Sequence, residues 1–409
     1  MASGQPTERA ADDVTVAGVE LAAGTSGLKE SGRPDLALIR LAEGTATAAM
    51  FTRNAFCAAP VQVARLHLEA GRPRVLLINS GCANAGTGAA GLRDAEATCA
   101  CAGAACGVDA SSVLPFSTGV IGPRLVDKLP LEDLCRAIEG CAHTLRQDAW
   151  DAAAEAILTT DTVSKLAWRT VELEGGTIKV TGIAKGSGMI RPDMATMLAF
   201  LATDARVERD ALDDILRAAV NESFHAITVD GDTSTNDAVT LSATGAAEVG
   251  LDGRADRDAF RAAVAGVCLE LAQAIVRDAE GATRLVEIEV SGGRDQSECR
   301  EVAFTVAHSP LVKTALFGGD PNWGRILAAV GRARIAGLDV ERVDIGLGEV
   351  DLVRGGQPVA GFDEAAAATV VRRDRVPIRI ALGRGDAAAR VWTSDLSYDY
   401  VRINADYRT

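Results

Sequence analysis

Apolar residues recur along the chain with two different periods, and the longer period predicts helices. The clearest example is the segment 256–279. Its large apolar residues follow one another at steps of three and four: Phe260, Val264, Val267, Leu271 and Ile275. Such spacing places them on one stripe of a helix. We also predict helices over the Ala-rich segment 88–106 and over 149–159 and 207–225.

Short apolar runs and period-two alternation predict strands. Residues 75–81 and 113–119 are buried-strand candidates that end in a glycine turn, and 178–185 is a strand leading to Lys185. A further strand is expected to lead into the polar run 229–237. After residue 281 alternation dominates. We expect a strand over 284–291 and two hairpins, one of 342–354 with 357–361 and one of 377–383 with 389–394.

The mixture of both periods predicts an α/β (α+β) protein with mixed sheets flanked by helices. The change of texture near residue 281 predicts two domains, a catalytic α/β region over 1–280 and a smaller C-terminal α/β domain over 281–409. A chain of 409 residues is long enough to bury substantial cores in both.

The charge composition indicates which kinds of binding partner are unsuited to this protein. The formal net charge of -14 argues against nucleic acid and against an anionic membrane surface. We find no run of roughly 18 apolar residues and no basic-then-apolar leader at the start, so we expect a cytoplasmic protein without a membrane span.

Cysteine and histidine usage predicts neither a metal site nor a cofactor. The nine cysteines are odd in number and lack paired Cys-x-x-Cys motifs, and no two of the four histidines are three to five residues apart. We therefore expect small free thiols in a reducing compartment. Walker A, Gly-x-Ser-x-Gly and a complete dinucleotide loop are absent, so nothing indicates a bound cofactor or a Ser-His-Asp hydrolase.

The strongest chemical pattern is the segment 185–204, in which a Lys185 glycine turn and a proline precede the bond between Ala195 and Thr196. This combination suits a bond that the protein cleaves itself, leaving Thr196 as a new N-terminus. A terminal threonine carries nucleophile and base in one residue, since its α-amine titrates at about 7.7–8.0. Lys185 is informative because only six of the 42 basic residues are lysines.

Other segments are weaker by themselves. Ser117–Gly122 could present backbone N–H groups to an oxyanion, although an ordinary tight turn is the commoner explanation. The run Asp230–Asp237 lacks the twelfth-position Glu of a calcium loop, so we expect turn and capping duties. Asp320–Arg325 is an unusual turn. The C-terminus is aromatic and strand-like to its last residue, which predicts that it is docked.

Together these motifs resemble the ornithine acetyltransferase (glutamate N-acetyltransferase) family of arginine biosynthesis. The similarity runs over nearly the whole chain. It covers the following segments: 31–36, 79–81, 117–122, 159–161, 185–198, 229–237, 280–283, 320–326 and 395–409. So many motifs in the family's order exclude a chance likeness.

The resemblance implies a self-processing fold, cleaved between Ala195 and Thr196 into an α chain 1–195 and a β chain 196–409, with two of each in a heterotetramer. It implies a ping-pong transfer of acetyl from N-acetyl-L-ornithine to L-glutamate through Thr196. Thr118 and Gly119 match the family's oxyanion hole. The residues that match its substrate-binding positions are Thr159, Lys185, Thr196, Glu280, Asn404 and Thr409.

Three departures from the family pattern stand out. Asp193 and Cys82 replace the usual Asn, and Arg284 replaces the usual Lys. Asp193 lies three residues before Thr196, so the amino-acid acceptor stays open. Also open are the use of acetyl-CoA as a second acetyl donor, an N-terminal-nucleophile aminopeptidase or amidohydrolase activity, and a non-enzymatic scaffold role.

Overall fold

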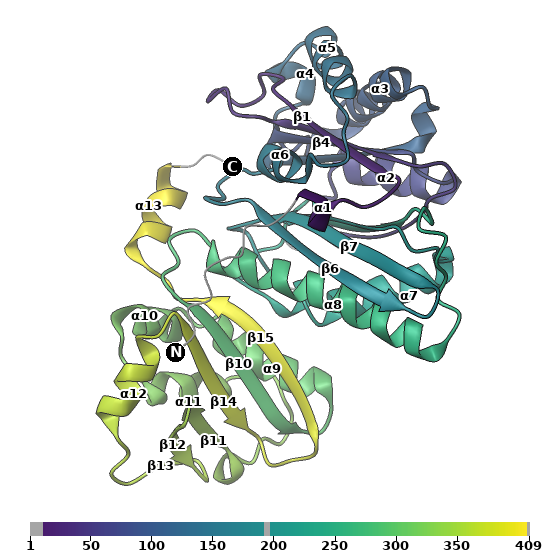
Figure 1. Cartoon of the computed structure of the whole chain (residues 1–409). Coiled ribbons are helices and arrows are strands. Elements are labelled where there is room, and N and C mark those ends of the chain that lie inside the picture. Colours follow the sequence, from purple (N-terminus) through teal and green to yellow (C-terminus); the bar gives the residue numbers. More distant parts are fainter. Residues whose placement is uncertain (1–10, 192–196, 407–409) are drawn as a thin grey trace.

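The computed structural model describes residues 11–191 and 197–406, which form three β-sheets and the helices that cover them (Figure 1). The first sheet has the strand order β1-β2-β4-β5, and only its β4–β5 pair is parallel. Its strands are β1 (Val19–Gly24), β2 (Leu36–Leu41), β4 (Val75–Cys82) and β5 (Val113–Val120).

The second sheet has the order β3-β9-β8-β7-β6, in which only β8 and β9 are parallel. Its strands are β3 (Ala46–Phe51), β6 (Lys165–Leu173), β7 (Gly176–Lys185), β8 (Leu198–Thr203) and β9 (Ala238–Ala243). The registers of β7 and β9 on β8 bring Lys185 beside Leu198, and Leu198 beside Ala238. One end of this sheet therefore holds Lys185 and the first residue of β8.

The first two sheets pack face to face, as the edge-on contact of Phe116 with Phe200 at 5.0 Å between ring centres illustrates. Helices cover both outer faces and give a helix–sheet–sheet–helix arrangement (Figure 1). On the first sheet lie α3 (Gly88–Cys106) and α5 (Leu131–Ala142); on the second lie α7 (Arg209–Asn221) and α8 (Arg254–Arg277). Helix α2 (Ala59–Ala70) packs against β5 and α3, and shorter helices are α1 (Ala11–Val14), α4 (Leu125–Lys128) and α6 (Trp150–Ala156).

The third sheet has the order β13-β12-β11-β14-β10-β15. Its strands are β10 (Leu285–Gly293), β11 (Asp344–Leu347), β12 (Val350–Arg354), β13 (Gln357–Pro358), β14 (Arg375–Ala381) and β15 (Ala387–Ser394). A separate apolar core joins it to its helices, namely α9 (Gln296–Ala307), α10 (Pro310–Gly318), α11 (Trp323–Gly331) and α12 (Glu364–Val371). The chain then ends in α13 (Tyr398–Asp406). The division into domains near residue 281 stays a prediction.

Helix α8 is the one helix within the described ranges that is long and apolar enough to cross a membrane by length and composition. Half of its apolar window is buried inside the protein, where Phe260, Val264 and Leu271 pack in the core beneath the second sheet. The predicted apolar stripe is thus the stripe of a core helix, and length and composition alone are weak evidence for a membrane span.

Three local predictions are wrong. The segments 377–383 and 389–394 are strands but not a hairpin, because β10 lies between β14 and β15 and pairs with both. The expected strand leading into residue 229 is not found among the described residues, and the strand instead follows the polar run as β9. The strand-like C-terminus is helical over Tyr398–Asp406. Alternation predicts extended segments, but it says little about which strand pairs with which.

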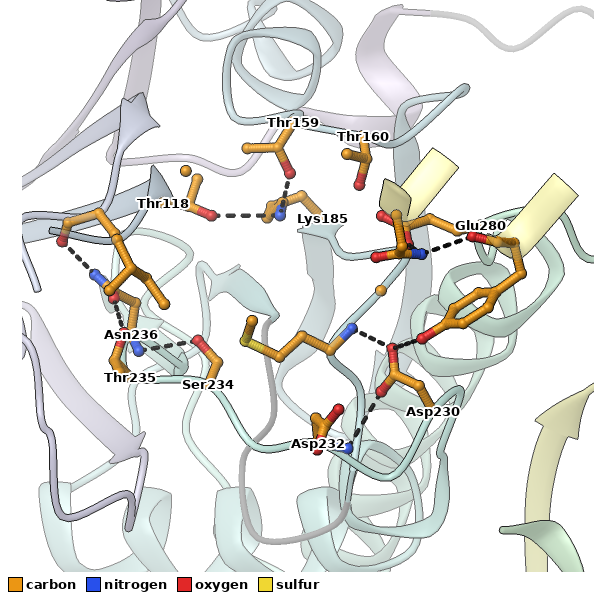
Figure 2. A pocket seen from close by; sticks show the side chains of 17 residues that line it. Thr118, Thr159, Thr160, Lys185, Asp230, Asp232, Ser234, Thr235, Asn236 and Glu280 are labelled. Atoms are coloured by element: carbon orange, nitrogen blue, oxygen red, sulfur yellow. Dashed lines mark hydrogen bonds between the residues drawn. The ribbon is translucent and has the colours of Figure 1, made fainter. Parts of the chain in front are cut away.

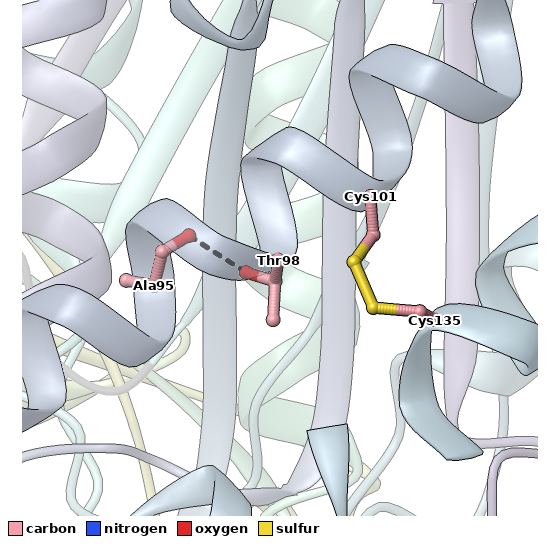
Figure 3. The surroundings of a disulfide bond; sticks show 4 residues. All are labelled: Ala95, Thr98, Cys101 and Cys135. Carbon is pink, nitrogen blue, oxygen red and sulfur yellow. Dashed lines mark hydrogen bonds between the residues drawn. A yellow bond between two sulfur atoms is a disulfide. The ribbon is translucent and has the colours of Figure 1, made fainter. Parts of the chain in front are cut away.

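The expectation that every cysteine is a free thiol is also wrong. Cys101 of α3 and Cys135 of α5 form a disulfide, with a Cα–Cα distance of 5.4 Å (Figure 3). The two helices pack side by side on the first sheet, which brings together thiols 34 residues apart in sequence. The other seven cysteines are free, and all nine lie within the described ranges.

Candidate active site

A cavity of about 250 Å³ opens between the first two sheets, the loop before β9 and helix α13. Six of the predicted site residues line it: Thr118, Gly119, Thr159, Lys185, Glu280 and Asn404 (Figure 2). They come from five separate parts of the chain, so the fold brings together residues that the sequence keeps up to 286 positions apart (404 minus 118). The predictions therefore converge on one place.

Lys185 is the cation at the wall of this cavity. It ends β7 and is only 2% exposed. Its Nζ donates hydrogen bonds to Thr159 Oγ1 at 2.7 Å and Thr118 Oγ1 at 3.3 Å (Figure 2). Burial lowers the pKa of the Lys185 ammonium from its ordinary value, and the nearby Asp161 carboxylate opposes this effect. The lysine is thus a buried cation that is held mainly by two hydroxyls.

Thr118 and Gly119 lie at the carboxyl end of β5, where the backbone of Gly119 passes close to Gly81 and Cys82 of β4. Gly119 has φ +130, and a Cβ on it would lie 2.4 Å from the carbonyl carbon of Gly81. Only glycine fits this backbone. The neighbouring Ser117 carbonyl accepts a hydrogen bond from Asn236 Nδ2 at 2.9 Å. The strand end is therefore fixed, with the Thr118 hydroxyl directed at Lys185.

Glu280 and Asn404 form the opposite wall. Asn404 Nδ2 donates to Glu280 Oε2 at 2.8 Å and also to the Tyr400 carbonyl at 3.0 Å. The Glu280 N–H donates to the Ser187 carbonyl at 2.9 Å, which ties the end of α8 to the turn after Lys185. The cavity thus has a cation on one side and a carboxylate on the other, as a zwitterionic ligand requires.

The loop Asp230–Asp237 performs the predicted capping duties. Asp230 accepts hydrogen bonds from the N–H groups of Met189 at 2.6 Å and Ile190 at 2.9 Å. Sequence reasoning missed that this loop also lines the cavity, through Asp230, Asp232, Ser234, Thr235 and Asn236. Other lining residues that it missed include Ala83, Ile121, Thr160, Gly188, Met189 and Tyr400. The density of short polar side chains in the loop was the available clue.

Asp237 occupies the end of that loop, beside the start of β8. Its Oδ1 accepts a hydrogen bond from the Met197 N–H at 2.9 Å, and the Ser234 side chain also lies close enough to interact with the carboxyl. Burial raises the pKa of this carboxyl well above its ordinary value, although the Met197 N–H and Lys185 act in the other direction. A buried carboxyl whose ionised form is disfavoured therefore holds the backbone just before β8.

Ala195, Thr196, Asp193 and Thr409 lie outside the described residues, so their predicted roles stay predictions. The other two departures do not line the cavity. Cys82 is buried with its Sγ 3.4 Å from the Pro123 carbonyl. Arg284 bonds to the Phe317 carbonyl at 3.2 Å and pairs with Asp395 at 3.3 Å. Among the described residues, no cluster of His, Cys, Asp or Glu is arranged to hold a metal ion.

This geometry defines the class of protein. It is a double-sheet α/β protein with a buried lysine, a glycine-fixed strand end and a polar cavity between its sheets. Residues 20–409 match the model of the ArgJ family, and the chain belongs to that family. It is 53% identical to the arginine biosynthesis bifunctional protein ArgJ of Methylococcus capsulatus over 409 residues, 99% of each chain.

Two solved structures are also similar. A crystal structure of the arginine biosynthesis bifunctional protein argJ from Bacillus halodurans has a TM-score of 0.49 at 42% identity, covering 51% of this chain and 98% of that chain. Ornithine acetyltransferase from Mycobacterium tuberculosis, complexed with ornithine, has a TM-score of 0.40 at 37% identity, covering 44% and 95%.

Proposed function

We propose that this protein is a glutamate N-acetyltransferase of arginine biosynthesis, which moves the acetyl group of N2-acetyl-L-ornithine to L-glutamate through an ester on Thr196. The observation that carries this proposal is the convergence of Lys185, Thr118, Thr159, Glu280 and Asn404 on one cavity (Figure 2). Membership in the ArgJ family and the names of the relatives support it. The enzyme is proposed to need no cofactor and to work in the cytoplasm.

The proposed maturation generates the nucleophile. The Thr196 hydroxyl attacks the Ala195 carbonyl, the C–N bond breaks, and the acyl group moves from nitrogen to oxygen. Water then hydrolyses this ester, which leaves a carboxylate on Ala195 and a free amine and hydroxyl on Thr196. The products are an α chain 1–195 and a β chain 196–409, and two of each form a heterotetramer.

In the proposed transfer, the α-amine of Thr196 takes the proton of its own hydroxyl, directly or through water, and the oxygen attacks the acetyl carbonyl. Thr118 and Gly119 stabilise the oxyanion, with the Lys185 Nζ 3.3 Å from Thr118 Oγ1. Ornithine leaves with the proton, and the glutamate amine then attacks the acetyl ester.

The two walls of the cavity suit the two ends of an amino-acid substrate. Glu280 is proposed to hold the ornithine ammonium. Lys185 and the C-terminal residues Asn404 and Thr409 are proposed to hold carboxylates, and the Thr159 hydroxyl, 2.7 Å from Lys185 Nζ, lies beside the lysine.

The relative from Methylococcus capsulatus is named a bifunctional protein, which supports a second activity in this chain. We propose that acetyl-CoA also acetylates glutamate here, through the same Thr196 ester. Incubation of the purified protein with acetyl-CoA and glutamate, with free CoA thiol as the readout, tests this. Release of CoA that does not depend on glutamate would instead indicate transfer to water.

N-terminal sequencing and mass spectrometry of the purified protein test the central claim. We expect the 42.4 kDa chain to be replaced by two fragments, one of which begins Thr-Met-Leu-Ala. Thr196→Ala should leave one intact chain without acetyl transfer, and Thr196→Ser should still be processed. An intact wild-type chain with full acetyl transfer would overturn the proposal. Rapid hydrolysis of peptide amides without transfer would favour an aminopeptidase.

A further inference from the structure

A chain of four buried charged side chains leads from the cavity wall to a site outside it. Lys185 Nζ lies 3.8 Å from Asp161 Oδ2, Asp161 Oδ1 lies 2.7 Å from Lys165 Nζ, and Lys165 Nζ lies 2.6 Å from Asp278 Oδ2. The four side chains are 0–6% exposed. Only Lys185 among them lines the cavity. The charges alternate in sign, so every ion has an opposite neighbour.

The two lysines share Asp161 unequally. Lys165 makes the close contact, and Asp161 Oδ1 also accepts from the Gly186 N–H at 2.6 Å. Its Oδ2 accepts from the Thr159 N–H at 3.1 Å. Lys185 Nζ lies beyond hydrogen-bond range of Asp161 Oδ2, and its direct partners are the hydroxyls of Thr118 and Thr159. The carboxylate nearest to Lys185 is therefore largely engaged elsewhere.

We propose that Lys165 and Asp161 are positioning residues for the cavity, and that competition between the two lysines for Asp161 sets how firmly the Lys185 ammonium is held against Thr118 and Thr159. Asp278 completes the device by holding Lys165 from the other side, while it accepts hydrogen bonds from the Thr162 N–H at 3.1 Å and the Val163 N–H at 3.4 Å.

The charges around Lys185 fix the direction of each effect. Asp161, Asp237 and Glu280 favour its ammonium form, whereas Lys165 disfavours it and Lys29 lies close enough to interact with it. Removing the charge of Lys165 therefore raises the pKa of Lys185, and removing the charge of Asp161 lowers it further. A group that only stabilised the fold would not move this pKa in opposite directions in the two variants.

A buried ion pair is weak evidence for stability, since hydrophobic residues of similar volume often serve as well. This network also contacts the site directly, because Asp161 accepts from the N–H groups of Thr159 and Gly186, which flank the Lys185 interaction. A positioning role accounts for the burial of four charges at this place, and hydrophobic packing could not supply it.

Competitive labelling with acetic anhydride across pH 6–11, read at each lysine by peptide mass spectrometry, measures the Lys185 pKa without any catalysis. We expect the Lys185 midpoint to rise by about one pH unit in Lys165→Met and to fall by about one unit in Asp161→Asn. Lys165→Arg, which keeps the charge, should stay within a few tenths of wild type. Lys128→Met, at an exposed lysine, is the matched control.

Lys165→Met leaves two buried carboxylates without their lysine, so it is paired with the milder Asp278→Asn, in which we expect a small fall of the same midpoint. If the Lys185 midpoint is unchanged in Asp161→Asn and Asp278→Asn, or moves in one direction in every variant, the inference is wrong. Its consequence for acetyl transfer rests on the proposed function: the Lys185 limb of the pH–rate profile should shift with the midpoint. Shifted midpoints in a protein without transfer activity would overturn the proposed function and leave the inference standing.

Discussion

The Asn404 side-chain amide donates a hydrogen bond to Glu280 Oε2 over 2.8 Å, across 124 residues of sequence. Helix α13 otherwise has no buried residue, and Tyr398 at its start is 84% exposed. The helix is held at the cavity by polar contacts, among them the Tyr400 hydroxyl at 3.3 Å from Asp230 Oδ2, and by the rings of Tyr398, edge-on to Phe317 at 5.6 Å, and Tyr400, which packs against the core. These contacts orient the Glu280 carboxylate.

Asn404→Ala should weaken substrate binding and leave the fold intact. The lost hydrogen bond connects exposed groups, so we expect a cost of about 1 kcal/mol, which corresponds to a KM about fivefold higher for the amine-bearing substrate. The thermal midpoint should stay within a degree or two of wild type. Steady-state kinetics measure the first effect, and Arg402→Ala, on the same exposed helix, is the control. An unchanged KM would show that Glu280 needs no partner.

Gly119→Ala should destabilise the protein far more than Gly122→Ala. Both glycines have positive φ, +130 and +108, so both substitutions strain the backbone by roughly 1–2 kcal/mol. A Cβ at Gly119 would also overlap Gly81 and Cys82, whereas nothing lies within 4 Å of one at Gly122. The overlap adds about 1–3 kcal/mol. Urea unfolding measures the difference, and equal losses would mean that β5 can move away from β4.

Seven free thiols are expected in the unfolded, non-reduced protein, since Cys101 and Cys135 are bonded. The bond closes a loop of 34 residues, which corresponds to about 3–4 kcal/mol of stability in the chain-entropy model. Cys101→Ser should lose that amount without reductant and nothing relative to wild type when both are reduced. Cys106→Ser, at a free thiol, is the control. A count of nine thiols would contradict the disulfide.

Elements of the fold that depend on local patterns could be predicted from the sequence, and those that depend on contacts between distant segments could not. The helix 88–106 and the strand 75–81 follow from local patterns and are confirmed within one residue at each end. The place of β10 between β14 and β15 and the pairing of Cys101 with Cys135 depend on long-range packing, which a single sequence does not encode locally.

The site divides in the same way. Lys185 was identifiable from residue chemistry, because a rare lysine on a glycine turn before Thr196 suggests a function by itself, whereas the strand-end pattern at Thr118 was weak without the family resemblance. Glu280 and Asn404 followed only from the family resemblance. The loop 230–237 and the network through Lys165 and Asp278 were missed, since their importance comes from packing against elements distant in sequence.

Acidification should destabilise the protein through His308. Its Nε2 lies 2.9 Å from Thr228 Oγ1, whose own proton goes to the Ile190 carbonyl, so the imidazole donates. Burial and the charges of Arg191 and Lys313 lower the pKa of His308 to about 4. Below pH 6.5 the unfolded state binds a proton that the folded state does not, so stability is complete above about pH 7 and falls toward pH 4.

The loss should be at most about 3 kcal/mol and should disappear in His308→Gln, which keeps a donor. Urea unfolding at pH 7.0, 5.5 and 4.5 measures it, with His143→Gln, at an exposed histidine, as the control. Parallel pH curves for wild type and His308→Gln would show that another group is responsible.

Asp237→Asn should stabilise the protein at alkaline pH, because the buried carboxyl of Asp237 has a raised pKa. Such a group contributes fully to the free energy of unfolding below the unfolded-state pKa of about 3.9. This contribution is lost as the pH rises toward the folded-state pKa. Asparagine does not titrate and keeps an oxygen for the Met197 N–H. The advantage of Asp237→Asn over wild type should therefore grow between pH 5 and pH 8.

Asp237→Ala separates the two contributions of this side chain. It also removes the titration, but it leaves the Met197 N–H without its acceptor, which costs about 1–3 kcal/mol. At pH 8 we expect Asp237→Asn to be more stable than both the wild type and Asp237→Ala. Urea unfolding measures this, on samples whose chain composition is checked by mass spectrometry. A constant difference between Asp237→Asn and wild type from pH 5 to pH 8 would mean that the carboxyl is ionised in the fold, and the Lys185 ammonium would then be the charge that holds it so.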